Sequence, residues 1–573
     1  MKKANFSLFD HMLLYTPTSS KRKPYRSTQI IATIPQKPQK DEIIQMIEAG
    51  MNIARFNASN GKEDLKAIEV SLAVLREAVD DYNEIRRKEA DKQNQKCNPD
   101  DENAAIEKCP SVHIATALDL KGIFYQTGTF TSPSCDPIEI IGGNDINLTT
   151  ETSFENNISN QWIYVDCPFL LSLQPNQTII VDKFIKLRVL NVDDAAKAVQ
   201  CRIEQGGNLK ADTKMEVNIP GLKCGMSSLT DDTLPAINFC KKNELDILIA
   251  PINDPSAFAM IKCTVNPEGS PNGLKVIAKL EGEQAVKKVD KIIEKADGVM
   301  ISRGRLGRNI SPEQVIVYQK NIIAKCLKAG IPSIVASDVL KSMEKEGSDG
   351  TRAEISDIVN MVLDGTDCVM LDEGASSKHC VETMRNTIME AEDMINYRRW
   401  YWELMTQIPN PPVPLSSNEI SNAVAISACT AAMVNGANAI IVLTDTGRTV
   451  KMISKYRPEC PIIAVANSAI VARQVLLVRG VFSICLDGEL QKILIILDTE
   501  RFPFHAEAKT DNYQKSVEER VEAGIQFAKG CCLITKYPGA VVAVMASDER
   551  GKSNSVILFY NEIFLITKFY IQQ

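Results

Sequence analysis

Histidine is scarce in this chain, with 4 residues among 573. The four are dispersed along the sequence, so they indicate neither a histidine-ligated metal site nor a serine-histidine catalytic pair. The formal net charge of -7 argues against the generally basic surface of a nucleic-acid-binding protein. No apolar run reaches the roughly 18 residues of a membrane-spanning helix. We therefore expect neither a nucleic acid nor a membrane as a partner.

Paired metal-ligand spacing is also missing among the 16 cysteines, which are scattered along the chain. No secretory signal peptide is recognisable before them. Scattered cysteines in this context are typical of reduced, mostly buried thiols rather than of a disulfide framework. We therefore expect a cytoplasmic protein.

What the chain does contain is a repeated pattern of short apolar runs followed by helix-like stretches. Eight runs precede Pro411, at 30–34, 52–56, 112–118, 247–250, 276–280, 298–301, 334–336 and 368–371. Helix-like stretches follow most of them, for example at 41–49, 282–295, 311–329 and 352–363. Near-continuous apolar strands alternating with helices predict a parallel (β/α)8 barrel.

Two insertions interrupt this pattern. The interval after the third run is too long for a loop, and it alternates in a strand-like way at 123–130, 162–165, 178–181 and 184–189. It therefore predicts an inserted all-β lid domain. The second insertion, 84–109, is charged and rich in Asn, Lys and Asp, which predicts a solvent-exposed loop.

Beyond the barrel, the proline-rich segment 408–414 predicts a linker. Strand-like runs at 439–444, 462–466 and 541–545, with helices between them, predict a separate α/β domain. The predicted organisation is an amino-terminal arm at 1–27, the barrel at 28–122 and 219–407, the lid at 123–218 and the carboxy-terminal domain at 408–573.

Charged residues follow neighbouring strands, where barrels of this kind place their reactive face. Lys279 and Glu281 lie at the end of the fifth run, and a glycine-flanked turn containing Arg305 follows the sixth. A cation and a carboxylate at one strand end, beside such a turn, predict a site for phosphate and metal. A second carboxylate for the metal is missing.

These motifs resemble those of the pyruvate kinase family, in which a Lys-x-Glu strand is followed by a strand ending in Arg-Gly-Asp-Leu-Gly. The segments 54–61, 118–122 and 351–354 match as well, and Thr351 and Glu354 also have the spacing of a capping box. The resemblance implies a glycolytic, ATP-binding transferase that moves phosphate from phosphoenolpyruvate to ADP. It also implies Mg²⁺ (or Mn²⁺) and K⁺ as cofactors, and a homo- or hetero-tetramer.

The resemblance also implies roles for individual residues. Lys279 would stabilise the moving phosphoryl group, Arg55 would steady phosphate, and Ser337 would assist protonation. Glu281 would bind Mg²⁺. The implied K⁺ ligands are the side chains of Asn57, Ser59 and Asp119 and the backbone carbonyl of Leu120, and the implied nucleotide-side residues are Arg55 and Asn60.

Arg305 stands where the family has its second metal-binding carboxylate, an aspartate. A guanidinium about 5 Å from Mg²⁺, at an effective dielectric of about 20, repels it by roughly 6 to 7 kcal/mol. Arg305 could pair with Glu281 and fill the metal site, hold phosphate together with Lys279, or swing toward water and leave a residual metal-dependent enzyme. The sequence thus predicts a pyruvate kinase-like phosphotransferase whose activity is reduced or lost. The alternative is a catalytically silent paralogue that binds phosphometabolites or assembles with an active subunit.

A second anion feature lies in the carboxy-terminal domain. The turn at 444–449 follows an apolar strand and opens a helix, so its hydroxyls and backbone N–H groups can cap the helix or cradle an anion. Together with the segment 455–458, it resembles the family's loop for a sugar-phosphate activator. The effector-phosphate residues that this implies are Thr444, Thr446, Arg448 and Thr449. The opposing loop, 547–552, lacks the family's tryptophan and adds acidic charge, which predicts phosphate binding without bisphosphate selectivity.

Overall fold

The computed structural model describes residues 23–58, 61–94, 111–122, 125–130, 137–182, 185–209, 214–219, 232–267, 273–345, 347–406, 417–485, 510–531, 533, 541–546, 553–560 and 563–565. Most of the predicted arm, the predicted linker at 408–414 and the predicted activator loop at 547–552 lie outside these residues.

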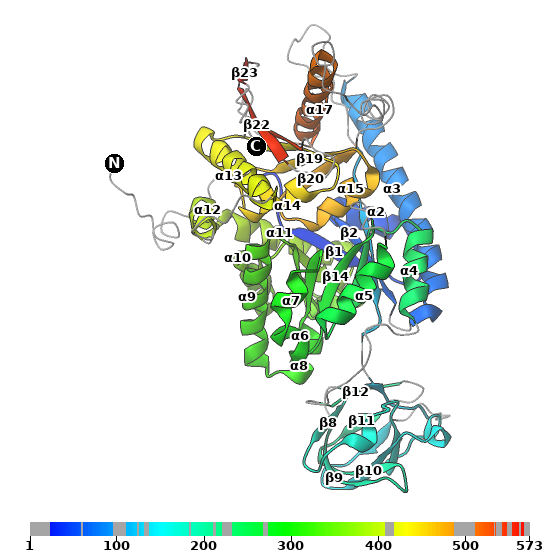
Figure 1. The fold of residues 1–573 in the computed structure, drawn as a ribbon. Helices are drawn as coiled ribbons and strands as arrows, with labels where there is room; N and C mark the ends of the chain where they lie inside the picture. The colour runs from blue at the N-terminus through cyan, green and yellow to red at the C-terminus, as the bar shows by residue number, and fades with distance from the viewer. Residues whose placement is uncertain are drawn as a thin grey trace.

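Parallel strands close into a barrel in the order β1-β17-β16-β15-β14-β13-β3-β2, at the centre of Figure 1. They are β1 (Gln29–Thr33), β2 (Ile53–Ala58), β3 (Ala115–Leu120), β13 (Ile247–Pro251), β14 (Lys275–Leu280), β15 (Gly298–Ser302), β16 (Ser333–Ala336) and β17 (Cys368–Leu371). Each predicted apolar run forms one of these strands, so the predicted barrel is confirmed. Because the strands are parallel, their carboxyl ends meet at one mouth.

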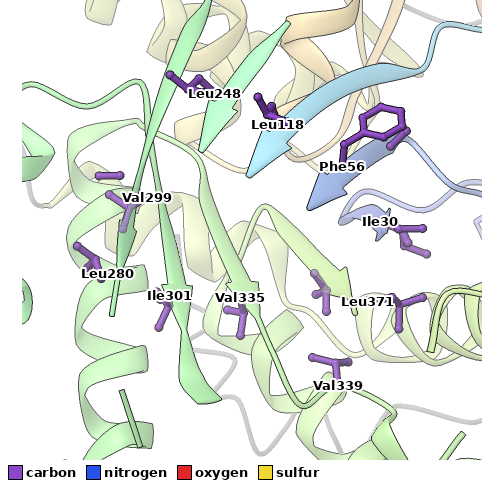
Figure 2. Packing of buried hydrophobic residues seen from close by; sticks show 14 of the residues in the cluster. Ile30, Phe56, Leu118, Leu248, Leu280, Val299, Ile301, Val335, Val339 and Leu371 are labelled. Atoms are coloured by element: carbon purple, nitrogen blue, oxygen red, sulfur yellow. The ribbon is translucent and has the colours of Figure 1, made fainter. Parts of the chain in front are cut away.

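Successive residues of each strand point alternately into the barrel and out toward the helices. On β1, Ile31 packs inside the barrel with Met370, whereas Ile30 packs outside it. Figure 2 shows the outward set, in which Phe56 and Leu118 come from neighbouring strands. Both faces of the sheet are buried, which explains why its strands are continuous apolar runs rather than alternating ones.

The helices that cover the barrel are α2 (Lys40–Ala49), α3 (Leu65–Asn94), α4 (Thr233–Lys242), α5 (Pro255–Val265), α6 (Glu283–Lys287), α7 (Val289–Ile293), α8 (Arg303–Asn309), α9 (Pro312–Ala329), α10 (Arg352–Asp364), α11 (Lys378–Asp393) and α12 (Tyr397–Met405). The predicted helix at 282–295 is interrupted at Lys288, between α6 and α7. The predicted capping box is present on α10. The Glu354 amide donates to Thr351 Oγ1 (3.3 Å), and the Thr351 amide donates to Glu354 Oε2 (2.8 Å).

The prediction of a loop over 84–109 is wrong in its first part, because α3 continues to Asn94. Glu84 pairs with Lys88 one turn later, with 2.6 Å between the charged atoms. Ala, Glu, Lys, Arg and Gln are strong helix formers, and such pairs stabilise a helix surface. The charged run is therefore the solvated face of a helix up to residue 94, and residues 95–109 lie outside the described part of the chain.

The inserted segment forms a β domain with its own apolar core, which includes Ile163, Val181 and Leu187. Its main sheet has the order β4-β12-β8-β9-β10-β6-β7, and β11 pairs with β5. The strands are β4 (Tyr125–Gln126), β5 (Ile138–Ile140), β6 (Asp145–Thr149), β7 (Trp162–Tyr164), β8 (Thr178–Val181), β9 (Ile185–Asp193), β10 (Ala198–Gln205), β11 (Gly207–Leu209) and β12 (Glu216–Asn218). The expected all-β lid is therefore confirmed as a fold.

The carboxy-terminal domain is built on a sheet of order β20-β19-β18-β21-β22-β23. Its strands are β18 (Ala439–Thr444), β19 (Ile462–Ala466), β20 (Val481–Cys485), β21 (Val541–Ala546), β22 (Ser553–Tyr560) and β23 (Ile563–Leu565). Its helices are α13 (Ser417–Asn435), α14 (Arg448–Lys455), α15 (Ala469–Gln474), η6 (Val475–Leu477) and α17 (Thr510–Gly530). The domain and the lid lie at opposite ends of the barrel (Figure 1).

Residues of the carboxy-terminal domain close one end of the barrel. Leu476 and Leu477 of η6 join the apolar core inside it. Three arginines of the domain form ion pairs with carboxylates of the barrel part: Arg457 with Asp367 (2.8 Å), Arg473 with Asp246 (2.9 Å) and Arg479 with Glu392 (3.3 Å). The carboxyl ends of the strands, at the opposite end, are thus left for the site.

Among the described residues, no helix combines the length and the hydrophobicity needed to cross a bilayer. The cysteines in the same part of the chain carry thiols, and most of them are buried. Burial raises the pKa of the Cys201 thiol to about 12, so this group stays protonated at neutral pH.

Candidate functional site

Three strand ends bring Arg55, Asp119 and Lys279 into a buried cluster. Arg55 donates from Nε and Nη2 to Asp119 Oδ2 (2.9 and 2.6 Å), and Lys279 Nζ donates to Asp119 Oδ1 (2.7 Å). Burial by itself would raise the pKa of Asp119, but the charges of Lys279 and Arg55 and their hydrogen bonds outweigh it and lower this pKa. Asp119 therefore stays ionised and holds both cations at the barrel mouth.

Two of the predicted potassium ligands, Asp119 and the Leu120 carbonyl, contact the ammonium of Lys279. Besides Asp119, Lys279 Nζ donates to the backbone carbonyl of Leu120 (2.8 Å). Asn57 Oδ1, on the neighbouring strand, accepts from Arg55 Nη2 (3.2 Å). Because an ammonium is itself a compact monovalent cation, the two oxygens that accept from Lys279 have the chemistry that a potassium ion requires. The predicted ligand Ser59 and the predicted nucleotide residue Asn60 lie outside the described residues.

Glu281 lies beside Gly122, the last barrel residue before the predicted lid, which leaves room for its side chain. A Cβ atom on Gly122 would lie 2.6 Å from Glu281 Oε2, so this position admits no side chain without moving the carboxylate. Glu281 Oε1 is 3.3 Å from Lys279 Nζ, and the side chain is 11% exposed. The glutamate is therefore confined between Gly122 and Lys279.

Arg305 lies on the helix α8, which begins directly after β15. The predicted glycine-flanked turn is therefore wrong, because these residues complete a short helix on the barrel mouth. Arg305 Nε is 3.8 Å from Glu281 Oε1, and Arg305 Nη1 pairs with Glu216 Oε2 of β12 in the lid. The guanidinium thus lies between a barrel carboxylate and a lid carboxylate.

These contacts decide whether a divalent ion fits. Magnesium takes oxygen ligands in near-octahedral geometry, but Glu281 faces the cations Lys279 and Arg305. Across the described part of the chain, no group of three or more His, Cys, Asp or Glu side chains could hold a metal. The donor set around Glu281 therefore does not fit Mg²⁺.

The loop after β16 holds Ser337 in a strained backbone. Ser337 and Asp338 have φ values of 72° and 57°, a region that non-glycine residues rarely adopt. Arg303 donates from Nε and Nη2 to the Ser337 carbonyl oxygen (3.3 and 3.1 Å) and from Nη1 to both carboxylate oxygens of Asp357 (2.8 and 2.6 Å). Gly304 allows the close approach, because a Cβ atom there would lie 2.9 Å from Asp338 Oδ2. These contacts hold the Ser337 backbone at the mouth.

One cavity, with a volume of about 260 Å³, joins these residues. Its lining includes the predicted site residues Arg55, Asn57, Asp119, Leu120, Lys279, Glu281, Arg305 and Ser337. Glu216 was not predicted, because a sequence does not show which lid residue faces the barrel. The role of Arg303 was not predicted either, although the adjacent Gly304 was an available signal.

The predicted effector residues lie far from this cavity, at the amino terminus of α14. Thr444 Oγ1 accepts from the Gly447 amide (2.9 Å), and Thr446 Oγ1 accepts from the Arg448 amide (3.4 Å). Thr449 is buried within the first turn. The two hydroxyls therefore cap the turn and the start of the helix. Helix capping is the alternative to anion binding for this segment.

The family models and the relatives that match this chain agree on one family. The family model for the pyruvate kinase barrel domain matches residues 25–384, and the model for the pyruvate kinase alpha/beta domain matches residues 422–557. Pyruvate kinase PKLR of Homo sapiens is 35% identical over 465 residues, which cover 80% of this chain and 75% of that protein. A pyruvate kinase of Hypocrea jecorina is 30% identical over 539 residues, which cover 93% of this chain and 89% of that protein.

Proposed function

Because this chain belongs to the pyruvate kinase family, we propose that it binds phosphoenolpyruvate at the barrel mouth and transfers its phosphoryl group to ADP only slowly. The observation that carries this proposal is the placement of Arg305 between Glu281 and Glu216. Lys279 and Arg55 support the proposed binding of phosphoenolpyruvate, and the guanidinium of Arg305 supports the proposed slow transfer.

In this proposal the chain's own cations bind the substrate. Lys279 and Arg55 are nearly buried at the cavity wall, where their charges are screened less than at the surface. Lys279 faces the phosphoryl group and Arg55 steadies it. Ser337, whose carbonyl Arg303 holds, presents its hydroxyl for protonation of the enolate carbon.

Slow transfer follows from the charge at the metal position. A guanidinium about 5 Å from a divalent ion costs roughly 6 to 7 kcal/mol at an effective dielectric of about 20. Phosphoryl transfer depends mainly on positioning and on charge stabilisation. Arg305 supplies one positive charge where the family supplies a carboxylate for magnesium, so it stabilises the transfer incompletely.

Asn57, Asp119 and the Leu120 carbonyl would hold a potassium ion if Lys279 turned toward a bound phosphate. A bound potassium ion would supply positive charge that offsets the charge of the phosphate. On the nucleotide side, Arg55 and Asn60 are the residues that we expect ADP to meet.

Three further assignments belong to this proposal. Thr444, Thr446, Arg448 and Thr449 would take the phosphate of a sugar-phosphate effector. We expect a cytoplasmic protein that assembles as a tetramer. The ion pairs of Arg305 also favour a second candidate, a silent subunit that binds phosphometabolites and assembles with an active relative.

A coupled assay with phosphoenolpyruvate, ADP, Mg²⁺ or Mn²⁺, and K⁺ tests the proposal. We expect low turnover in the wild type and an increase of at least about tenfold in Arg305→Asp, because a carboxylate returns to the metal position. Lys291→Asp makes the same charge change on an exposed residue of α7 and is the matched control.

Robust wild-type turnover that Arg305→Asp does not increase would overturn the proposed impairment. Absence of turnover in both proteins, together with altered cooperativity of a co-expressed active relative, would favour the silent subunit.

A further inference from the structure

The lid contributes a carboxylate to the barrel mouth. Glu216 reaches Arg305 from β12, whose backbone is held within the lid sheet by pairing with β4 and β8. The Glu216 carbonyl also accepts a hydrogen bond from the Asp182 amide (2.7 Å). The Glu216 side chain is 13% exposed. The lid therefore delivers this carboxylate from a fixed strand into a nearly buried position.

The ion-paired cluster at the mouth is balanced in charge. Its cations are Arg55, Lys279 and Arg305, and its carboxylates are Asp119, Glu281 and Glu216. An anionic ligand that enters a neutral cluster gains little unless it replaces one of the resident carboxylates.

The three carboxylates differ in how firmly they are held. Asp119 is bound by both Arg55 and Lys279 and is fully buried. Glu281 is confined between Lys279 and Gly122. Glu216 belongs to the other domain, so it is the carboxylate that can withdraw without disturbing the barrel.

We propose that Glu216 competes with the ligand for Arg305. Its carboxylate occupies the guanidinium until a small phosphorylated carboxylic acid replaces it, and this exchange requires no divalent cation. The ligand class rests on the proposed function of the site. Arg305 then meets the ligand's anionic oxygens as a two-pronged donor beside the Lys279 ammonium. The misfit of magnesium and the presence of Arg305 thus have one explanation, since the guanidinium takes over the anion-binding role of the metal.

Calorimetric titration with phosphoenolpyruvate in EDTA tests this exchange, with inorganic phosphate as a second probe. We expect the wild type to bind in EDTA, and Glu216→Gln to bind about tenfold more tightly, because a competing charge is removed. Arg305→Met should lose this binding, and the double variant should show no gain from Glu216→Gln. Glu204→Gln, which neutralises a carboxylate paired with Arg188 elsewhere in the lid, should leave affinity unchanged.

Wild-type binding that appears only with Mg²⁺, or a Glu216→Gln affinity equal to that of Glu204→Gln, would overturn the exchange. Weaker binding by Glu216→Gln would also overturn it, because a purely structural contact would lose affinity when broken. Arg305→Lys keeps the positive charge but loses the paired N–H donors of the guanidinium, so it should bind with intermediate affinity. This variant tests the proposal if Arg305→Met does not fold. The coupled assay reports on slow turnover independently, so the two proposals can fail separately.

Discussion

The ammonium of Lys279 lies 2.7 Å from Oδ1 of Asp119, in a pair whose side chains are 8% and 2% exposed. The same carboxylate binds Arg55 through its other oxygen. Two cations therefore share one buried aspartate, and the ammonium covers oxygens that the family resemblance assigns to potassium.

Potassium should strengthen ligand binding. In the proposed mechanism, a bound phosphate would attract Lys279 away from Asp119 and would leave Asp119 Oδ1 and the Leu120 carbonyl for a monovalent cation. We expect phosphoenolpyruvate to bind about tenfold more tightly in K⁺ than in tetramethylammonium, as measured by calorimetry. The effect should shrink in Asn57→Ala, and equal affinities in the two salts would contradict the prediction.

Removing the charge of Asp119 should destabilise the barrel. Asp119→Asn leaves Arg55 and Lys279 buried with one neutral partner, and breaking a buried pair in this way costs about 3 to 5 kcal/mol. Chemical unfolding should show the loss. Asp290→Asn removes the exposed pair with Lys325 (2.8 Å) and should cost no more than about 1 kcal/mol. Equal losses of unfolding free energy for the two substitutions would contradict the prediction that the buried pair contributes more than the exposed pair.

A methyl group on Gly122 should move Glu281. The added Cβ atom would lie 2.6 Å from Glu281 Oε2, whereas at Gly282 the nearest neighbour would be Asn253 Oδ1 at 3.5 Å. We therefore expect Gly122→Ala to change phosphoenolpyruvate affinity by about tenfold or more, a shift of about 1.4 kcal/mol, and Gly282→Ala to leave it nearly unchanged. Titration of both variants checks this, and similar affinities would show that the backbone at Gly122 accommodates the methyl group without moving Glu281.

Lys275 should make stability depend on alkaline pH. Burial, with repulsion from Lys451, lowers the pKa of Lys275 from 10.5 to about 8. The folded chain therefore bears the full cost of the buried charge below pH 8 and loses this cost as pH rises toward 10.5.

Lys275→Met should consequently raise the free energy of unfolding at pH 7 by about 1 to 3 kcal/mol. The difference from the wild type should shrink between pH 8 and pH 10.5. Denaturant midpoints across this range measure it, with the exposed Lys291→Met as the control. A difference that stays constant with pH would exclude Lys275 as its source.

The sequence was sufficient to predict secondary structure where burial or short-range contacts set the local residue pattern. The barrel strands were predictable because both of their faces are buried, and the capping box of Thr351 and Glu354 was predictable because it depends on residues three positions apart. The helical end of α3 was missed because charge alone does not separate a solvated helix face from a loop.

The sequence by itself determined the family and the barrel, and it singled out the arginine that the resemblance aligns with a metal-binding aspartate, because these depend on motifs and on the burial of short segments. Only the tertiary structure decided what that arginine contacts. Glu216 and Arg305 belong to different domains, and their meeting depends on how the lid is oriented over the barrel mouth. No local pattern encodes that orientation, since it is the sum of contacts between two separately packed cores.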